Sequence, residues 1–172
     1  LYPGQNSTDL VPLSSFDNYP IWNTPPSTSD IELRIKQFHR VYHDCLKSEI
    51  ERLKAIHGQV FLYDCHSIRS KIPFLFDDQL PDLNIGDNSG QSCDSKITNA
   101  IQQVCARFSD YRHVVNGRFK GGWTTRHYGQ PDDNVHAFQM ELAQHRYLES
   151  EKPPFLYDPV NANELRKVLR TI

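Results

Sequence analysis

The stretch Val60–Arg69, VFLYDCHSIR, decides which fold the sequence predicts. Its apolar beginning, Val60–Leu62, comes shortly after Gly58 and is typical of a short buried strand. Asp, His, Ser and Arg then gather in Tyr63–Arg69, where that strand is expected to end. Ligands of open α/β sheets bind at the carboxyl ends of strands, so this cluster indicates a site. A buried turn whose polar groups are hydrogen-bonded explains the cluster equally well, without any ligand site.

The segments around this stretch predict an α/β fold, in which helices and strands follow one another. Upstream, apolar residues recur at helical spacing from a capping box at Ser29–Glu32 to Gly58, which ends the helix. The other expected elements are a loop at 73–93, a helix that begins at Ser92 or Asp94, a strand at 113–116, a loop at 117–129, a strand at 135–142 and a helix that opens at 161–164.

The composition is that of one globular domain, or part of one. The chain has 172 residues, of which 38% are hydrophobic and 23% are charged. The formal charge is −2 and no dense Lys/Arg block occurs, which argues against nucleic-acid binding. No apolar stretch approaches the ~20 residues of a membrane span, so no membrane partner is expected. The four cysteines form no C-x-x-C pair and indicate free thiols of a cytoplasmic protein.

Residues 1–28 are expected to form a long ordered loop that leads into a single domain covering residues 1–172. Five prolines and many Ser, Thr and Asn residues argue against a helix in this segment. Large apolar side chains would anchor the loop, namely Leu10, Val11, Leu13, Phe16, Tyr19, Ile21 and Trp22.

Four clusters stand apart from the packing pattern and could carry chemistry. They are Asp64–Arg69, Asn116–Gly122, Thr125–Gly129 and Gln139–Leu142. Single arginines and histidines in such loops are more often solvated or structural. Glu141 is harder to explain in that way, because a carboxylate within an apolar strand is rarely buried without a partner. An Arg partner, a metal-linked water or proton transfer would each account for it. Arginine loops beside a histidine and a carboxylate suit an anionic substrate and a metal-bound water.

The sequence closely resembles the N-formylglutamate amidohydrolase (N-formylglutamate deformylase) family, over essentially its whole length. Several long motifs occur in the family order, which is far more specific than one short pattern. The matching motifs are YDCHSIR at 63–69, LPDLNIG at 80–86, NGRFKGG at 116–122, TRHYG at 125–129 and VHAFQMELAQ at 135–144.

The resemblance implies a zinc-dependent hydrolase that splits N-formyl-L-glutamate, a small dicarboxylate, into L-glutamate and formate during histidine degradation. The implied fold is related to that of zinc carboxypeptidases, with a mostly parallel sheet flanked by helices. Carried over by motif, His66 is a Zn²⁺ ligand and Glu141 is the general base. The implied substrate-binding residues are Arg69, Arg118, Arg126, His127 and Asn84.

The sequence departs from the family pattern in one respect. The family has an upstream portion with an early histidine motif, and nothing here corresponds to it. We therefore expect the resemblance to concern the C-terminal two-thirds only, with the N-terminal part missing. Catalytic zinc takes three protein ligands and only His66 is identified, so this chain by itself could be inactive. Two alternatives stay open: another metal-dependent amidohydrolase or carboxypeptidase-like enzyme acting on an acylated amino acid, and a non-catalytic remnant that binds an acidic ligand.

Overall fold

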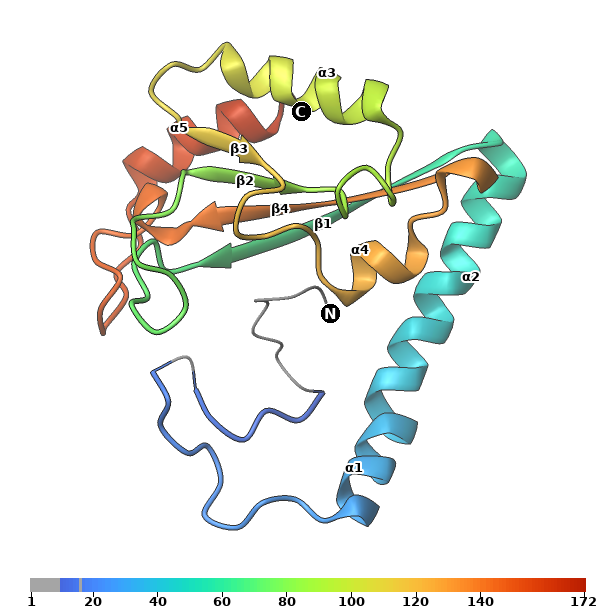
Figure 1. Ribbon diagram of the computed structural model, residues 1–172, viewed down its shortest axis with the longest axis vertical. Coiled ribbons are helices and arrows are strands. Elements are labelled where there is room, and N and C mark those ends of the chain that lie inside the picture. The colour runs from blue at the N-terminus through green and yellow to red at the C-terminus, as the bar shows by residue number, and fades with distance from the viewer. Residues whose placement is uncertain (1–9, 16) are drawn as a thin grey trace. The chain divides into compact units, whose positions relative to one another are not determined.

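The computed structural model describes residues 10–15 and 17–172. The chain forms two compact units. The first comprises the described part of Leu1–Glu49 together with Ile72–Asp78, and the second comprises Ile50–Lys71 and Gln79–Ile172. The second unit contains all of the sheet and all of the residues for which a site was predicted (Figure 1).

A long helical stretch precedes the sheet, as the sequence predicts. It consists of α1 (Thr28–Arg34), a π-helical segment (Ile35–His39) and α2 (Arg40–His57). Gly58, with φ of +73°, ends it. The predicted cap was wrong by two residues, because Ser27 and not Ser29 is the N-cap. The Ser27 hydroxyl accepts the Asp30 N–H at 3.2 Å, and the Asp30 carboxylate accepts the Ser27 N–H at 3.1 Å.

Four strands form a mixed sheet in the order β1-β4-β2-β3. The strands are β1 (Val60–Ile68), β2 (Leu83–Gly86), β3 (His113–Val115) and β4 (Val135–Ala143). The β1–β4 and β2–β3 pairs are parallel, whereas β2 runs antiparallel to β4. The α/β class is therefore confirmed, and the sheet is mixed.

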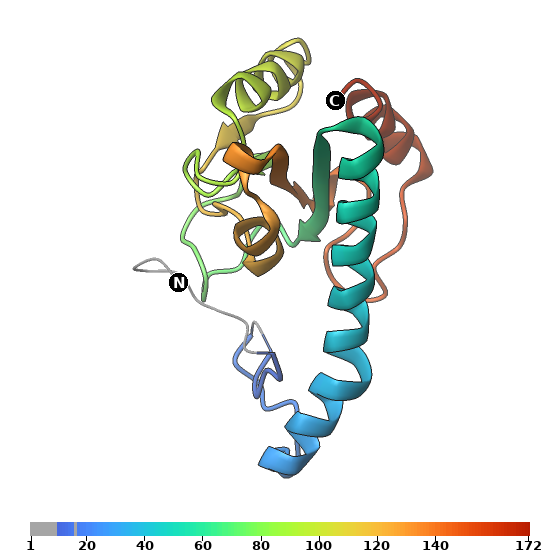
Figure 2. The ribbon, with the colours of Figure 1, turned by 90° about the vertical axis from the view of Figure 1, so that its right-hand side faces the viewer.

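Helices cover both faces of this sheet (Figures 1 and 2). On one face, α3 (Ser95–Ala106) and α5 (Pro159–Leu169) contribute to the hydrophobic core with β2 and β4. Its buried members are Leu83, Ile85, Cys93, Ile101, Cys105, Phe138, Met140, Leu165 and Val168. The short helix α4 (Trp123–Tyr128) packs on β4 and β1 at the opposite face. Two 3₁₀ turns, Pro131–Asp133 and Gln144–Arg146, flank β4.

Three expectations about the elements were wrong. The segment 73–93, expected to be a loop, contains β2, and the segment 117–129 contains α4. The strand expected to end at Tyr63 continues to Ile68, so Asp64 and His66 lie within β1 and not beyond it. The polar residues fit a strand because β4 pairs with β1 over its whole length.

The described part of the Pro-rich segment folds back on itself. Ser14 and Pro20 form an isolated bridge, and Trp22 Nε1 donates to the Pro12 carbonyl at 2.8 Å. Of the expected anchors, Leu10, Leu13, Tyr19 and Ile21 are more than half exposed, and Phe16 lies outside the described residues. Among the described helices, none is long and apolar enough to span a membrane.

Candidate active site

Five polar side chains share the face of the sheet that lies opposite the hydrophobic core. Asp64 and His66 come from β1, Asn84 from β2, and Gln139 and Glu141 from β4. The register pairs Asp64 with Gln139, and it pairs Glu141 with both His66 and Asn84. Because paired residues point to the same side of a sheet, the five side chains form one group, here called the polar face.

Glu141 is the buried carboxylate of the polar face. Its residue is 6% exposed, and Gln139 Nε2 donates to its Oε2 at 2.9 Å. Burial raises the pKa of Glu141 to about 7, against the opposing effects of the His66 charge and the Gln139 hydrogen bond. A carboxylate with a pKa near neutrality can both accept and return a proton, which is what a general base requires.

His66 is supported by Asp64, two residues earlier on β1. His66 Nε2 lies 2.9 Å from Asp64 Oδ1. The hydrogen bond to Asp64 raises the pKa of His66, although burial works in the opposite direction. The second oxygen, Asp64 Oδ2, is buried and has no hydrogen-bond partner. A carboxylate on one ring nitrogen is the usual support of a metal-binding histidine, with the other nitrogen facing the metal.

The described residues do not complete a catalytic zinc site. A catalytic zinc has three protein ligands. Within the described part of the chain, no group of three His, Cys, Asp or Glu side chains could hold a metal. The Asp64–His66 pair fits one ligand and its support.

A glycine-rich loop crosses the polar face between β3 and α4. A Cβ atom on Gly86 would lie 2.5 Å from the Gly121 nitrogen, so only glycine at position 86 lets the loop pass this close to β2. Gly122 N–H donates to Gln139 Oε1 at 2.7 Å. Gln139 therefore accepts a hydrogen bond from the loop through Oε1 and donates one to Glu141 through Nε2.

The predicted substrate-binding residues are distributed around the polar face. Arg69 directly follows β1, Arg118 lies in the glycine-rich loop with its guanidinium 5.8 Å from the Phe119 ring centre, and Arg126 lies on α4. Arg126 Nη1 donates to the Gly121 carbonyl at 2.9 Å, which ties α4 to the loop.

The two other predicted pocket residues differ in exposure. His127 is exposed and stacks on Trp123, with the ring centres 4.1 Å apart. Asn84 is fully buried, and its Nδ2 donates to the carbonyl oxygens of Pro81 and Glu141 at 2.8 and 3.0 Å. Asn84 Oδ1 is buried without a hydrogen-bond partner. Substrate contact by either residue stays a prediction.

Comparison with known proteins identifies the family. The family model described as N-formylglutamate amidohydrolase matches residues 1–148. The chain belongs to this family. The expected restriction to the C-terminal two-thirds was wrong, because the match begins at residue 1.

Two curated relatives of this family member are named N-formylglutamate deformylase. The protein from Pseudomonas aeruginosa is 44% identical over 96% of the chain, and the protein from Pseudomonas putida is 44% identical over 100%. The chain spans 63% and 64% of their lengths. A crystal structure of N-formylglutamate amidohydrolase from Ralstonia eutropha JMP134 matches with a TM-score of 0.76 at 20% identity. That match covers 88% of this chain and 56% of the other, and it shows the shared fold.

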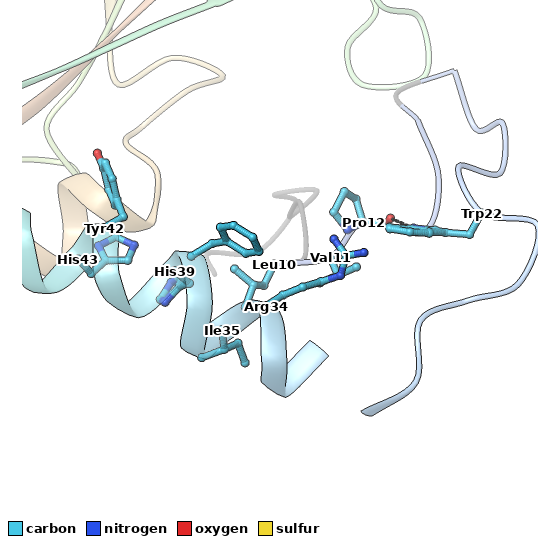
Figure 3. Close-up of a pocket in the computed structure, with 10 residues that line it drawn as sticks. Leu10, Val11, Pro12, Trp22, Arg34, Ile35, His39, Tyr42 and His43 are labelled. Carbon is cyan, nitrogen blue, oxygen red and sulfur yellow. Dashed lines mark hydrogen bonds between the residues drawn. The ribbon is translucent and has the colours of Figure 1, made fainter. Parts of the chain in front are cut away.

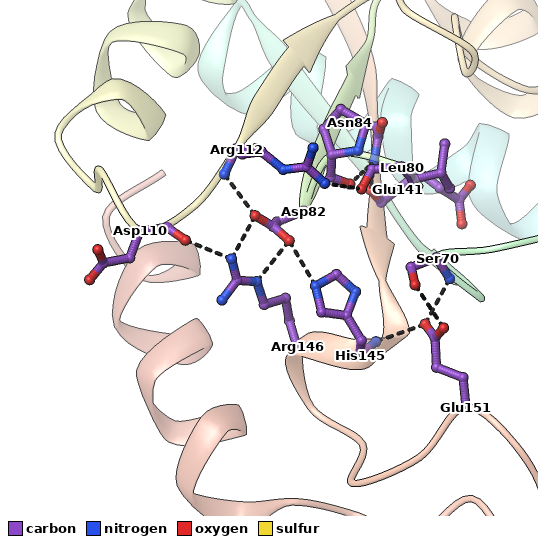
Figure 4. Close-up of polar contacts among 11 residues, drawn as sticks. Ser70, Leu80, Asp82, Asn84, Asp110, Arg112, Glu141, His145, Arg146 and Glu151 are labelled. Carbon is purple, nitrogen blue, oxygen red and sulfur yellow. Dashed lines mark hydrogen bonds and ion pairs between the residues drawn. The ribbon is translucent and has the colours of Figure 1, made fainter. Parts of the chain in front are cut away.

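A second buried charge cluster in this family member lies beyond the end of β4 (Figure 4). Asp82 is 1% exposed, and its two oxygens lie 2.7 Å from Nε and Nη2 of Arg146. His145 Nε2 lies 3.0 Å from Asp82 Oδ1, and the Arg112 N–H donates to Oδ2 at 2.7 Å. Burial raises the pKa of Asp82, but its bonds to Arg146 and Arg112 outweigh burial and lower the pKa overall. Sequence reasoning missed this cluster, since its residues lie far apart in the chain.

The first unit contains a pocket of about 440 Å³ (Figure 3). Its lining is mainly apolar and aromatic, and the Arg34 guanidinium lies 5.2 Å from the Trp22 ring centre. The lining residues are Leu10, Val11, Pro12, Trp22, Arg34, Ile35, Phe38, His39, Tyr42 and His43. Among the described lining residues, the histidines His39 and His43 are present and no carboxylate is.

Proposed function

We propose that this protein hydrolyses N-formyl-L-glutamate to L-glutamate and formate, as a step of histidine degradation. The observation that carries the proposal is Glu141, a buried carboxylate with a pKa of about 7 beside an Asp-supported histidine. The names of the two Pseudomonas relatives support the choice of substrate.

Glu141 acts on the water that attacks the formyl carbon. In the ionised form its carboxylate takes a proton from that water, and it then delivers the proton to the departing amine nitrogen. Because Gln139 holds Oε2, the remaining oxygen is the one available to the water. The C–N bond of the formamide breaks, and the products are formate and an amino acid.

We propose Zn²⁺ as the cofactor, with His66 as one of its ligands. A zinc ion polarises the carbonyl it faces and lowers the pKa of a bound water towards ~7. Asp64 would hold the His66 ring in the orientation for such a role.

The arginines give selectivity for a dicarboxylate. We assign Arg69, Arg118 and Arg126 to the two carboxylates of the substrate, because guanidinium groups bind carboxylates in bidentate fashion. His127 and Asn84 are proposed to line the same pocket. Holding both carboxylates places the formyl carbon near Glu141, which lowers the entropic barrier to attack.

Formate release from N-formyl-L-glutamate tests the proposal, with N-acetyl-L-glutamate and N-formyl-L-glutamine as comparison substrates. We expect turnover of N-formyl-L-glutamate to exceed that of both analogues. Faster turnover of the acetyl compound would favour another acylated amino acid as the substrate. Calorimetric binding of L-glutamate without any turnover by a zinc-supplemented protein would favour the non-catalytic reading.

A further inference from the structure

We propose that Glu151 is a positioning residue that fixes Arg69 for a substrate carboxylate. The inference rests on the role given to Arg69 under the proposed function. Glu151 lies outside residues 1–148, the part of the chain that the family model matches.

Glu151 holds the residue that follows Arg69. Its Oε1 accepts the Ser70 backbone N–H at 2.7 Å, and its Oε2 accepts the Ser70 hydroxyl at 2.7 Å (Figure 4). Ser70 is 2% exposed, so these bonds are shielded from competing water. A charged acceptor with two donors from one residue fixes the position of that residue strongly.

The backbone bond acts directly on Arg69. The Ser70 N–H belongs to the peptide group that also contains the Arg69 carbonyl, and this group is planar. Fixing the N–H therefore fixes the orientation of the whole peptide group, and with it the rotation about the Arg69 Cα–C bond. On the other side of Arg69, Ile68 is the last residue of β1 and pairs with Ala143 of β4.

The carboxylate is itself held by the segment that follows β4. The His145 N–H donates to Glu151 Oε1 at 2.9 Å, so Glu151 connects the end of β4 with the end of β1. In the same segment, Tyr147 Oη donates to Ser67 Oγ at 2.7 Å. Residues 67 and 70 are thus both bonded to the segment 145–151, and Arg69 lies between them.

A double-mutant cycle with Arg69 tests the inference in the zinc-supplemented protein that hydrolyses N-formyl-L-glutamate. We expect Glu151→Ala to raise KM roughly tenfold with kcat nearly unchanged. In an Arg69→Ala background, Glu151→Ala should have no further effect on KM, because the residue it positions is gone. Ser70→Ala, which removes only the hydroxyl bond, should raise KM less.

Glu149→Ala is the matched control, since it removes an exposed carboxylate from the same loop and should leave KM unchanged. If Glu151→Ala lowers the melting temperature but keeps the wild-type KM, while Arg69→Ala raises KM, the inference about Glu151 is overturned. The proposed function is not affected by that outcome. Additive effects of Glu151→Ala and Arg69→Ala on KM overturn the inference as well. If Arg69→Ala instead keeps the wild-type KM, Arg69 does not bind the substrate. The inference about Glu151 then fails together with that part of the proposed function.

Discussion

Glu141 and Gln139 are two residues apart on β4, and together they set the protonation of the candidate site. The alternation of the strand could be predicted from the sequence, and it places both side chains on one face. The sequence also indicated that a carboxylate at position 141 needs a partner. It did not indicate that Gln139 is this partner, because amide side chains contact many kinds of group and the glycine-rich loop had no predicted position.

Substituting Glu141→Gln should separate catalysis from stability. The amide keeps the shape but removes the base, so kcat should fall by roughly 10²–10⁴. Burial raises the folded-state pKa to about 7, above the unfolded value of ~4.3, so ionised Glu141 destabilises the fold as pH rises through 7. The melting temperature at about pH 8 should therefore not fall. Near-normal turnover with a lower melting temperature would instead identify Glu141 as a structural ion-pair partner.

Arg69, Arg118 and Arg126 should govern substrate affinity. Replacing one contacting arginine by Ala should cost roughly 2–5 kcal/mol of transition-state stabilisation, as for a broken buried charge pair. Lysine should not restore the loss, because it keeps the charge without the planar fork. The exposed Arg170 provides a matched Ala control. Wild-type kcat/KM in all three Ala variants would show that the substrate carboxylates bind elsewhere.

The length of each helix or strand, and its dependence on tertiary contacts, explain which elements could be predicted from the sequence. The long helix to Gly58, the helix α3 with its Asp94 cap, and the strands β3 and β4 are confirmed. The sequence missed β2, with 4 residues, and α4, with 6. Such short elements carry little periodicity, and their structure depends on neighbours: β2 is paired on both sides, and the N-cap of α4 has no side-chain hydrogen bond.

Gly86→Ala should displace the glycine-rich loop from β2. The new Cβ would meet backbone atoms of Lys120 and Gly121 at 2.6 and 2.5 Å, and backbone cannot rotate away as a side chain can. The Gly122–Gln139 bond should then weaken, and kcat/KM should fall roughly tenfold or more. Gly90→Ala is the control, because its Cβ would meet nothing within 4 Å and only its φ of +83° is unfavourable. Equal kcat/KM in the two variants would contradict this role for the loop.

The Asp82 cluster joins the segments before β2, before β3 and after β4, and its contribution should depend on pH. The lowered pKa of Asp82 means that ionised Asp82 stabilises the fold at pH values above the unfolded value of ~3.9. Asp82→Asn should therefore cost about 1.5–3 kcal/mol at neutral pH. The difference from wild type should disappear as pH falls through the folded-state pKa.

Urea unfolding at about pH 6 and about pH 3 compares the Asp82 variant with wild type above and below the unfolded value of ~3.9, and the difference should be smaller at about pH 3. Asp132→Asn, at an exposed position, is the control for loss of one carboxylate and should leave the midpoint unchanged at both pH values. A midpoint difference between Asp82→Asn and wild type that is the same at both pH values would rule out the ionised carboxylate as its source.

For the whole molecule, metal content is the measurement that bears most directly on activity. Among the described residues, His66 with its support Asp64 is the predicted ligand, and no group of three His, Cys, Asp or Glu side chains could hold a metal. Metal analysis of the protein purified without added zinc should therefore find well below one zinc per molecule, and His66→Ala should lower the content further. The exposed His57 provides a control substitution that should have no effect. A full equivalent of zinc that survives His66→Ala would place the metal elsewhere.

The parallel register of β1 and β4 also bears on how this sequence can change over evolutionary time. Asp64 and His66 share a face only because one residue separates them, and that residue, Cys65, points the other way. The identity of the residue at position 65 is thus free to vary within the limits of strand packing. The number of residues at this point is not, because a single insertion or deletion would turn the acid and the imidazole to opposite sides of the sheet. Substitutions can therefore accumulate between these two residues, whereas changes of length there abolish the pair in one step.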